Sequence, residues 1–234
     1  AICATEKNIL NTSSFLEAQV DELFSKDLKE KEHMPLSSYC HKEKGITYGV
    51  IKLGEECSDG VPCLRTSNVK PRFIKAENVK RISKKLSDEY SRTILEGGEL
   101  LVNVRGTLGG IAVVEECHRN WNVSREVAVV PIAQEVLDPY YAMYCVSSIS
   151  CQKWLSANTK GAAYVGINLA DLRNLPIPKI EKHHQLQIVA KIKTLRDQTE
   201  VLSECLTSKL KNLNALKSSI LDQAFSGQLT QDST

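Results

Sequence analysis

Four short polar stretches contain residue types that can bind phosphate groups and the edges of nucleobases. Arg and Asn side chains can each form two hydrogen bonds with guanine or adenine. Lys, Ser and Thr side chains and loop amides suit phosphate oxygens. Taken singly, each such residue is equally explained by a solvated surface or by an arginine that satisfies carbonyls of its own domain. The stretches are Arg65–Asn68 with Lys70 and Arg72, Asn103–Thr107, Asn122–Arg125 and Lys160–Tyr164.

Motifs of catalysis are missing from the sequence. It contains no GxxxxGK[ST] phosphate loop, no glycine-rich turn for a dinucleotide or S-adenosylmethionine, no GxSxG and no HExxH. The stretch Asp138–Tyr141 has a partial likeness to a signature of amino-group DNA methyltransferases, but Asp followed by Pro is typical of a helix N-terminus. Gly106–Gly110 lies between two β-rich runs and predicts a hairpin turn. We therefore expect no catalytic residue and no cofactor in this chain.

The eight cysteines predict free thiols rather than a metal site or disulfides. Cys40-His41, Cys57, Cys63 and Cys117-His118 could converge on zinc, yet their spacings match no standard ligand pair. Free thiols and the lack of a hydrophobic segment at the start are typical of the cytoplasm. No apolar run is long enough to cross a membrane. The net charge of +2 is too small to indicate a partner.

The polar stretches lie in a β-rich region that has a predicted helix on either side. A capping box of Ser14 and Glu17 predicts an N-terminal helix over about 14–32. From Leu36 to Pro178 short β-rich runs alternate with Gly and Pro turns, and Asp138-Pro139 opens a helix. Pro176 and Pro178 separate this region from the C-terminal part of the chain. The pattern predicts an α+β fold with a globular domain over 1–178, a long helix over 179–226 and a polar tail over 227–234.

The long helix has a seam of apolar residues at alternating steps of four and three. This spacing keeps the seam on one face and is typical of a coiled coil. At roughly 1.5 Å per residue the helix would be about 65 Å long, so its own turns cannot bury the seam. We expect a partner helix, although a solvent-bridging helix or one packed along its own domain would also be consistent. The seam contains Ile188, Ile192, Leu195, Leu202, Leu206, Leu213, Leu216 and Ile220, and Thr199, Lys209 and Gln223 interrupt it.

Four stretches in order resemble the specificity (S) subunits of type I restriction-modification enzymes. GVPCLRTSNVKPRFI (Gly60–Ile74) is similar to the family's early target-recognition segment. GELLVNVRGTLGGIAVV (Gly98–Val114) resembles its strand and Arg-Gly hairpin. The run from Thr159 to Ile192 resembles its exit through a Leu-Pro-Ile-Pro segment into the conserved helix. LKSSILDQAFSGQLT (Leu216–Thr230) resembles the end of that helix.

The resemblance implies a target-recognition domain for double-stranded DNA. Arg105 is then the first candidate for a base or backbone reader. Lys70, Arg72 and Arg125 are expected to contact phosphates. The complete set of expected DNA contacts is Arg65, Asn68, Lys70, Arg72, Arg105, Thr107, Arg125, Lys160 and Tyr164.

The resemblance also implies partners. S subunits recruit methyltransferase (modification) and restriction subunits, and usually have two recognition domains and two long antiparallel helices. This chain has one domain and one long helix, which predicts a homodimer whose antiparallel helices set the spacing of an interrupted palindrome. Two alternatives remain open. One is the recognition half of a larger fused methyltransferase-nuclease, and the other is a coiled-coil assembly protein without a DNA role.

Overall fold

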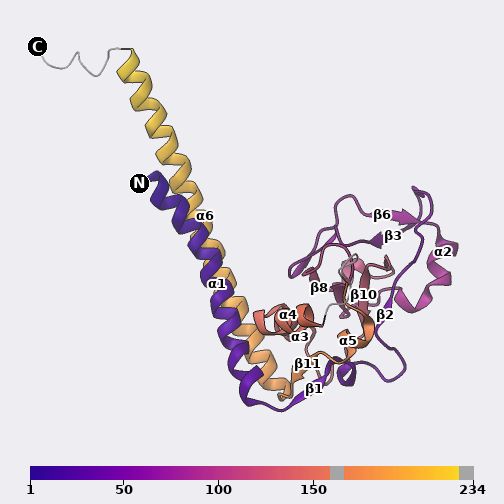
Figure 1. Cartoon of the computed structure of the whole chain (residues 1–234). Helices are drawn as coiled ribbons and strands as arrows, with labels where there is room; N and C mark the ends of the chain where they lie inside the picture. The colour runs from indigo at the N-terminus through magenta and orange to yellow at the C-terminus, as the bar shows by residue number, and fades with distance from the viewer. Residues whose placement is uncertain (159–165, 227–234) are drawn as a thin grey trace, which may run out of the picture. The chain divides into compact units, whose positions relative to one another are not determined.

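The computed structural model describes residues 1–158 and 166–226, apart from the side chains of residues 13 and 26–28 (Figure 1). The chain forms two compact units, which are described separately. Unit 1 consists of Ala1–Val20 and Ala190–Thr234, and unit 2 of Asp21–Val189. The sequence predicts two successive domains with a boundary at residue 178. The two units of the structure are not successive segments, because parts of the first and the last helix belong to the same unit.

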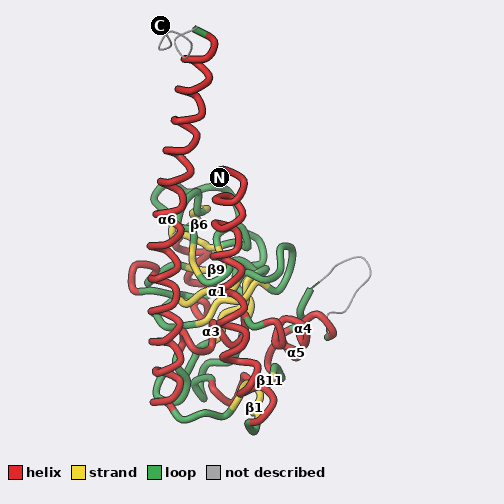
Figure 2. Tube along the Cα trace, turned by 90° about the vertical axis from the view of Figure 1, so that its left-hand side faces the viewer, coloured by secondary structure: helices red, strands yellow, loops and turns green. Residues whose placement is uncertain are grey.

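Unit 1 is an antiparallel pair of helices. It contains most of α1 (Ile2–Glu30) and most of α6 (Lys182–Phe225), and both views show these parts side by side (Figures 1 and 2). The inward residues of both helices recur at steps of three and four, as in a coiled coil. In α1 they are Ile2, Thr5, Ile9, Thr12, Leu16 and Val20, and in α6 they are Ile192, Leu195, Thr199, Leu206, Leu210 and Leu213.

The threonines of this seam satisfy their hydroxyls within their own helices. Thr5 Oγ1 donates to Ala1 O at 3.1 Å, Thr12 Oγ1 to Asn8 O at 2.7 Å and Thr199 Oγ1 to Leu195 O at 2.6 Å. A hydroxyl bonded in this way has little desolvation cost when the helices pack together.

The predicted start of the N-terminal helix was wrong, because α1 begins at Ile2 and not near residue 14. Ser14 is not an N-cap. Its Oγ donates to Leu10 O at 3.3 Å from inside the helix. The seam was overlooked because Thr5 and Thr12 take two of its positions, so a search for apolar residues alone misses the period.

The prediction that a second molecule must cover the whole seam of α6 also needs correction. Ile188 and Ile192 are already buried by this chain, at 7% and 1% exposure, so they cannot belong to a dimer interface. In unit 1 the α1 residues cover the nearer part of the seam. Leu216 and Ile220, beyond the start of α1, are 56% and 48% exposed. We call residues 214–225 of α6, all of them exposed, the overhang.

Unit 2 has an antiparallel four-stranded sheet at its centre. Its order is β2 (Thr47–Tyr48), β10 (Val127–Val130), β7 (Leu100–Asn103) and β8 (Ile111–Val113). Every residue of the last three strands is buried, as expected where both faces of a sheet are covered. Leu64, Leu95, Leu101 and Val127 belong to one core cluster against this sheet.

Three smaller pairings surround the central sheet. β6 (Lys80–Ile82) and β3 (Val61–Leu64) pair antiparallel, and β9 (Asn122–Val123) lies parallel to β3. β4 (Val69–Lys70) and β5 (Phe73–Ile74) form a hairpin. β1 (His33–Pro35) pairs with β11 (Pro176–Pro178), so the proline connector expected from the sequence forms a short strand.

Short helices complete unit 2, and their caps agree with the sequence. Ser83 caps α2 (Lys84–Glu89) by accepting from Leu86 N at 3.2 Å. Asp138 caps α3 (Pro139–Ser147) by accepting from Tyr140 N and Tyr141 N at 3.0 and 2.9 Å. The other helical segments are α4 (Ile149–Ala157), α5 (Leu169–Arg173) and the 3-10 turns η1 (Leu36–Tyr39), η2 (Ser91–Thr93) and η3 (Glu116–His118). The predicted α+β fold with a long C-terminal helix is confirmed. None of the described helices is sufficiently long and apolar to span a membrane.

Candidate nucleic-acid interface

The turn that joins β3 to β4 is held by the side chain of Asn68. Asn68 Oδ1 accepts from Arg65 N at 3.1 Å, and Nδ2 donates to Lys75 O and Glu77 O at 3.1 and 3.2 Å. The residue is only 2% exposed. Its amide group is bonded to the backbone of this turn and of the segment after β5, so the expected DNA contact by Asn68 does not fit the structure. The half-buried Arg65 begins the same turn and remains a candidate.

A second turn, residues 105–109, lies next to the first. Gly106 and Gly109 adopt φ angles of 70° and 85°, which favour glycine and allow the chain to reverse. Asn103 Nδ2 lies 3.0 Å from Thr107 O in this turn and 3.3 and 3.1 Å from Thr66 O and Val69 O in the other. The predicted stretches around Arg65 and Thr107 are therefore brought together by a shared amide.

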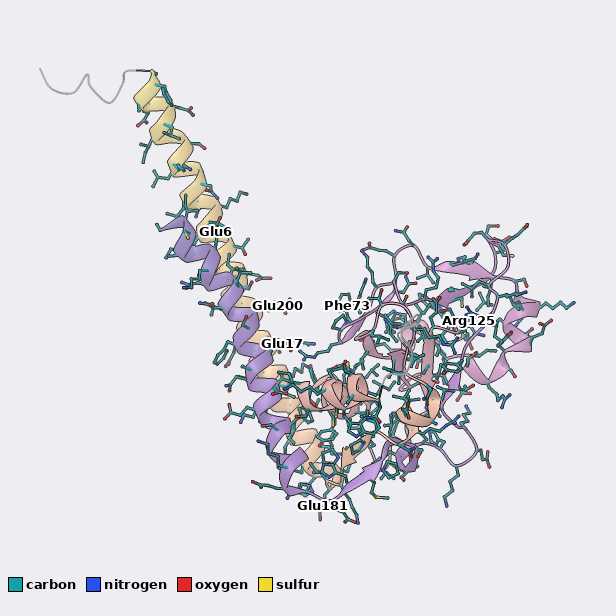
Figure 3. All side chains as sticks on the ribbon, in the orientation of Figure 1. Glu6, Glu17, Phe73, Arg125, Glu181 and Glu200 are labelled. Atoms are coloured by element: carbon teal, nitrogen blue, oxygen red, sulfur yellow. The ribbon has the colours of Figure 1, made fainter. Side chains whose placement is uncertain are left out.

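Lys70 and Arg72 lie on the β4–β5 hairpin. Arg72 has a φ of 70°, and its backbone N donates to Ile111 O at 2.7 Å. Its guanidinium carbon is 5.5 Å from the centroid of the Tyr144 ring. Phe73 at the tip of the hairpin is 57% exposed and lies apart from Arg125 in Figure 3. The predicted residues thus occupy two areas of unit 2.

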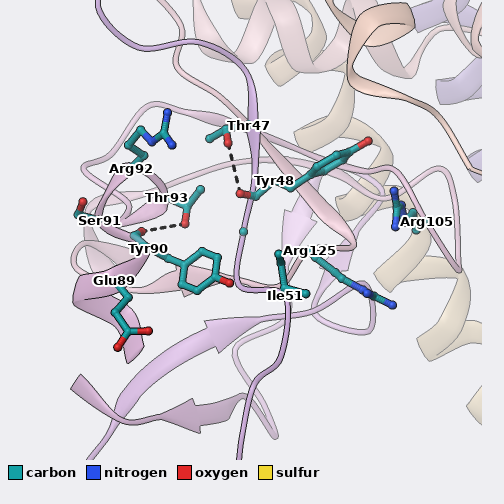
Figure 4. Close-up of a pocket in the computed structure, with 11 residues that line it drawn as sticks. Thr47, Tyr48, Ile51, Glu89, Tyr90, Ser91, Arg92, Thr93, Arg105 and Arg125 are labelled. Carbon is teal, nitrogen blue, oxygen red and sulfur yellow. Dashed lines mark hydrogen bonds between the residues drawn. The ribbon is translucent and has the colours of Figure 1, made fainter. Parts of the chain in front are cut away.

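The other area is a pocket of about 390 Å³ that three arginines line (Figure 4). Arg92, Arg105 and Arg125 form no ion pair among the residues that the structure describes. Glu89 is the one carboxylate among the lining residues that belong to the described part of the chain. Three arginines and one carboxylate among these lining residues give the pocket a positive charge balance, which favours an anionic ligand. The full lining is Thr47, Tyr48, Gly49, Ile51, Glu89, Tyr90, Ser91, Arg92, Thr93, Arg105 and Arg125.

Backbone contacts hold the arginines of the pocket in position. Arg105 pairs with Gly166 in an isolated antiparallel bridge, and its guanidinium carbon lies 5.2 Å from the centroid of the Tyr48 ring. Arg125 N donates to Val50 O at 2.8 Å. A Cβ on Gly49 would lie 1.9 Å from Val123 O, so only glycine permits this approach of the two segments.

Of the predicted contacts, Arg105 and Arg125 meet in the pocket, whereas Lys160 and Tyr164 lie outside the described residues. Sequence reasoning missed Arg92, Tyr48 and Tyr90, which line the same pocket. Arg92 follows a short helix, and the sequence around it, SDEYSRT (Ser87–Thr93), is typical of an ordinary polar surface. Only the long-range pairing of β2 with β10 brings Tyr48 beside the arginines.

The cysteines that were considered as zinc ligands are poorly suited to bind a metal. Burial raises the pKa of the Cys40 and Cys63 thiols to about 12, which disfavours the thiolate that a metal needs. Among the described residues Glu115, Cys117 and His118 form the one group of three close donors. Cys117 Sγ is 3.4 Å from His118 Nδ1 and 3.8 Å from Nε2, so the sulfur lies over the ring face, away from either lone pair.

The fold is similar to solved structures from type I systems. One such structure is described as the basis of complex assembly and conformational transition of the type I R-M system. It matches with a TM-score of 0.67 at 17% identity, covering 95% of this chain and 53% of that one. The HsdS subunit from Thermoanaerobacter tengcongensis matches with a TM-score of 0.60 at 18% identity, covering 96% of this chain and 53% of that one.

Sequence comparison agrees with the fold. The specificity subunit of the type I restriction enzyme EcoBI from Escherichia coli is 29% identical over 197 residues, which are 83% of this chain and 41% of that protein. This chain therefore spans less than half of that relative's length. The profile of the type I restriction modification DNA specificity domain matches residues 17–212. With most of its length inside that profile, this chain belongs to the family of type I restriction-modification DNA specificity domains.

Proposed function

We propose that this chain reads one half of a bipartite DNA site for a type I restriction-modification system. The observation that carries the proposal is the pocket of Arg92, Arg105 and Arg125, which lacks ion pairs among the described residues. Phosphate contacts would supply most of the affinity, and a few base-edge contacts the sequence choice.

The exposed arginines fit different roles in this proposal. Arg105 is the proposed base reader, because the ring of Tyr48 supports its guanidinium group while the side chain stays exposed. Arg92 and Arg125 are proposed phosphate contacts, together with Lys70 and Arg72 on the hairpin. Arg65 and Thr107, in the two neighbouring turns, and Lys160 and Tyr164 complete the set.

The chain's proposed partners supply the chemistry. Methyltransferase subunits would modify the DNA, and restriction subunits would cut it. The chain itself is proposed to act without a catalytic residue or cofactor. It would place those subunits at a chosen sequence, which is a binding task.

A second copy of the chain is the proposed partner of the overhang. Leu216, Ile220 and Leu221 are 56%, 48% and 44% exposed in the isolated chain. The overhang also repeats a motif of α1: Ser218–Asp222 reads SSILD, and Ser13–Glu17 reads SSFLE. Leu16 and Val20 of α1 pack inward in unit 1, and the residues that correspond to them are Leu221 and Phe225. Two overhangs that pair antiparallel about a two-fold axis would bury these residues and set two recognition domains at a fixed spacing.

The chain matches only part of a relative's length, and this supports a second candidate function. Because the chain matches only 41% of the EcoBI subunit, it can also be the recognition part of a longer polypeptide. An upstream recognition or catalytic domain in the same reading frame would support this alternative. In that case the additional chain, and not a second copy, would cover the overhang.

Selection from a random pool of duplexes tests the proposed function. The full chain is incubated with the pool at low salt, with and without the neighbouring methyltransferase subunit, and the retained duplexes are sequenced. The expected result is an interrupted motif with a constant spacer. If neither sample retains any duplex at low salt, the DNA role is wrong, because even nonspecific binding would be visible there.

A further inference from the structure

The buried side chain of Asn103 connects two turns that are far apart in sequence. Asn103 ends β7 and is 1% exposed. Its Nδ2 is shared among Thr66 O, Val69 O and Thr107 O at 3.3, 3.1 and 3.0 Å. The first two carbonyls belong to the turn of Arg65, and the third belongs to the turn that begins at Arg105. One amide group therefore satisfies both turns.

Gly110 packs directly against the amide group of Asn103. Asn103 N donates to Gly110 O at 2.8 Å. A Cβ on Gly110 would lie 2.2 Å from Asn103 Nδ2 and 2.3 Å from Val69 O. A larger residue at position 110 would displace the amide from the carbonyls, so the absence of a side chain there is part of the arrangement.

We propose that Asn103 is a positioning residue that couples the turn at 65–69 to the turn at 105–109, so that Arg65 and Arg105 meet DNA as one unit. The inference rests on the proposed function for its consequence, but the coupling itself is a property of the free chain. If the amide is lost, each turn can move by itself. Sequence discrimination then falls, because base-edge contacts depend on geometry more than phosphate contacts do.

Two substitutions remove the donor in different ways. Asn103→Asp keeps the shape but replaces the N–H groups with an oxygen that faces three carbonyl oxygens. Asn103→Ala removes the group and leaves these carbonyls without that donor. Gln185→Ala is the matched control. Gln185 is also 1% exposed, and its Nε2 donates to Val136 O and Ile180 O at 3.0 and 2.8 Å, in neither turn.

Hydrogen exchange of the free chain tests the coupling without DNA. In Asn103→Ala we expect amide exchange to rise about tenfold in both turns together, at Asn68 and Val69, which donate to Arg65 O in the first, and at position 103, whose amide donates to Gly110 O at the base of the second. Gln185→Ala should raise exchange around Val136 and leave both turns unchanged. The coupling is refuted if the Asn103 variants change one turn alone, or if they raise exchange to the same extent across the whole of unit 2.

DNA discrimination tests the consequence. The ratio of affinities for the selected duplex and a scrambled duplex should fall about tenfold in both Asn103 variants, with affinity for the scrambled duplex changed less than about twofold. Gln185→Ala should keep the ratio. An equal loss for both duplexes would overturn the inference. If the unsubstituted chain shows no preference, the proposed function fails instead, and hydrogen exchange still decides whether Asn103 couples the turns.

Discussion

The guanidinium carbon of Arg105 lies 5.2 Å from the centroid of the Tyr48 ring, which places the two in a cation–π contact. Arg105 leaves the end of β7, whereas Tyr48 belongs to β2 on the far side of β10. The contact orients an exposed arginine without using its hydrogen-bond donors. It leaves these donors available to a base edge.

Arg105→Lys should therefore weaken binding to the selected duplex by about tenfold, because lysine lacks the planar, two-pronged donor. Tyr48→Ala should cause a smaller loss, of about threefold, since only the support is removed. Tyr48→Phe is the control, and it should bind like the unsubstituted chain. Fluorescence anisotropy with labelled duplex measures all three. Equal binding by Arg105→Lys would rule out a base contact at this position.

Arg92→Gln and Arg125→Gln should act on affinity without changing sequence preference. Each substitution removes one proposed phosphate contact, so the slope of log K against log salt should become shallower by about one. Titrations at several salt concentrations give the slope for the selected and the scrambled duplex. Arg119→Gln is a suitable control, because Arg119 pairs with Glu116 at 2.7 Å outside the pocket. A slope unchanged in Arg92→Gln would remove Arg92 from the interface.

Gly49→Ala should destabilise unit 2 by about 3 kcal/mol or more, since the new methyl group would overlap Val123 O. Gly45→Ala provides the comparison, because a Cβ there has nothing within 4 Å. Denaturant unfolding followed by circular dichroism reports both. A Gly49 variant as stable as the Gly45 variant would mean that β2 and β9 can separate without cost.

His118 should make the protein less stable in mild acid. Burial lowers its pKa from the ordinary value of 6.5, an effect that nearby Glu115 opposes. The unfolded chain therefore binds the proton more tightly than the folded chain, so stability falls as the pH drops through the unfolded pKa. The free energy of unfolding, measured between about pH 7.5 and about pH 5.5, should fall less steeply in His118→Phe, which keeps a ring against Trp121. If the free energy of unfolding falls equally with pH in His118→Phe and in the unsubstituted chain, other groups cause the pH dependence.

Leu216→Glu should prevent self-association if two overhangs pair. A charge in the shared seam would be buried without a partner, and dimer affinity should fall by at least about tenfold. Val201→Glu is the control, since Val201 is 67% exposed and lies off the seam. Light scattering gives the mass of each variant. A monomer at tens of micromolar in the unsubstituted chain would exclude the homodimer.

Local signals in the sequence were reliable where the responsible contacts are local. The cap at Asp138 and the seam of α6 were both readable from short spacings. The start of α1 was not, because the threonines of its seam look polar in the sequence although their hydroxyls are satisfied inside the helix. Asn68 was predicted to point outward. Its three hydrogen bonds, to residues 65, 75 and 77, form only in the folded chain and leave no signal in the local sequence.

The pocket was the hardest part to predict. Its arginines come from three separate segments, and Tyr48 joins them through strand pairing across about eighty positions of chain. A local window contains Arg105 or Arg125 but never both with Arg92. Their shared environment depends on the sheet, and sequence reasoning identified the sheet only as a series of β-rich runs.

The threonines between the two long helices affect how easily these helices can separate. Thr5, Thr12 and Thr199 each keep their hydrogen bond inside a single helix. When the helices part, these three hydroxyls keep their partners, so the threonines lose apolar contact alone. At these three positions, separation of the helices therefore costs less than it would at leucines, and the proposed pairing with a second copy would benefit from that difference.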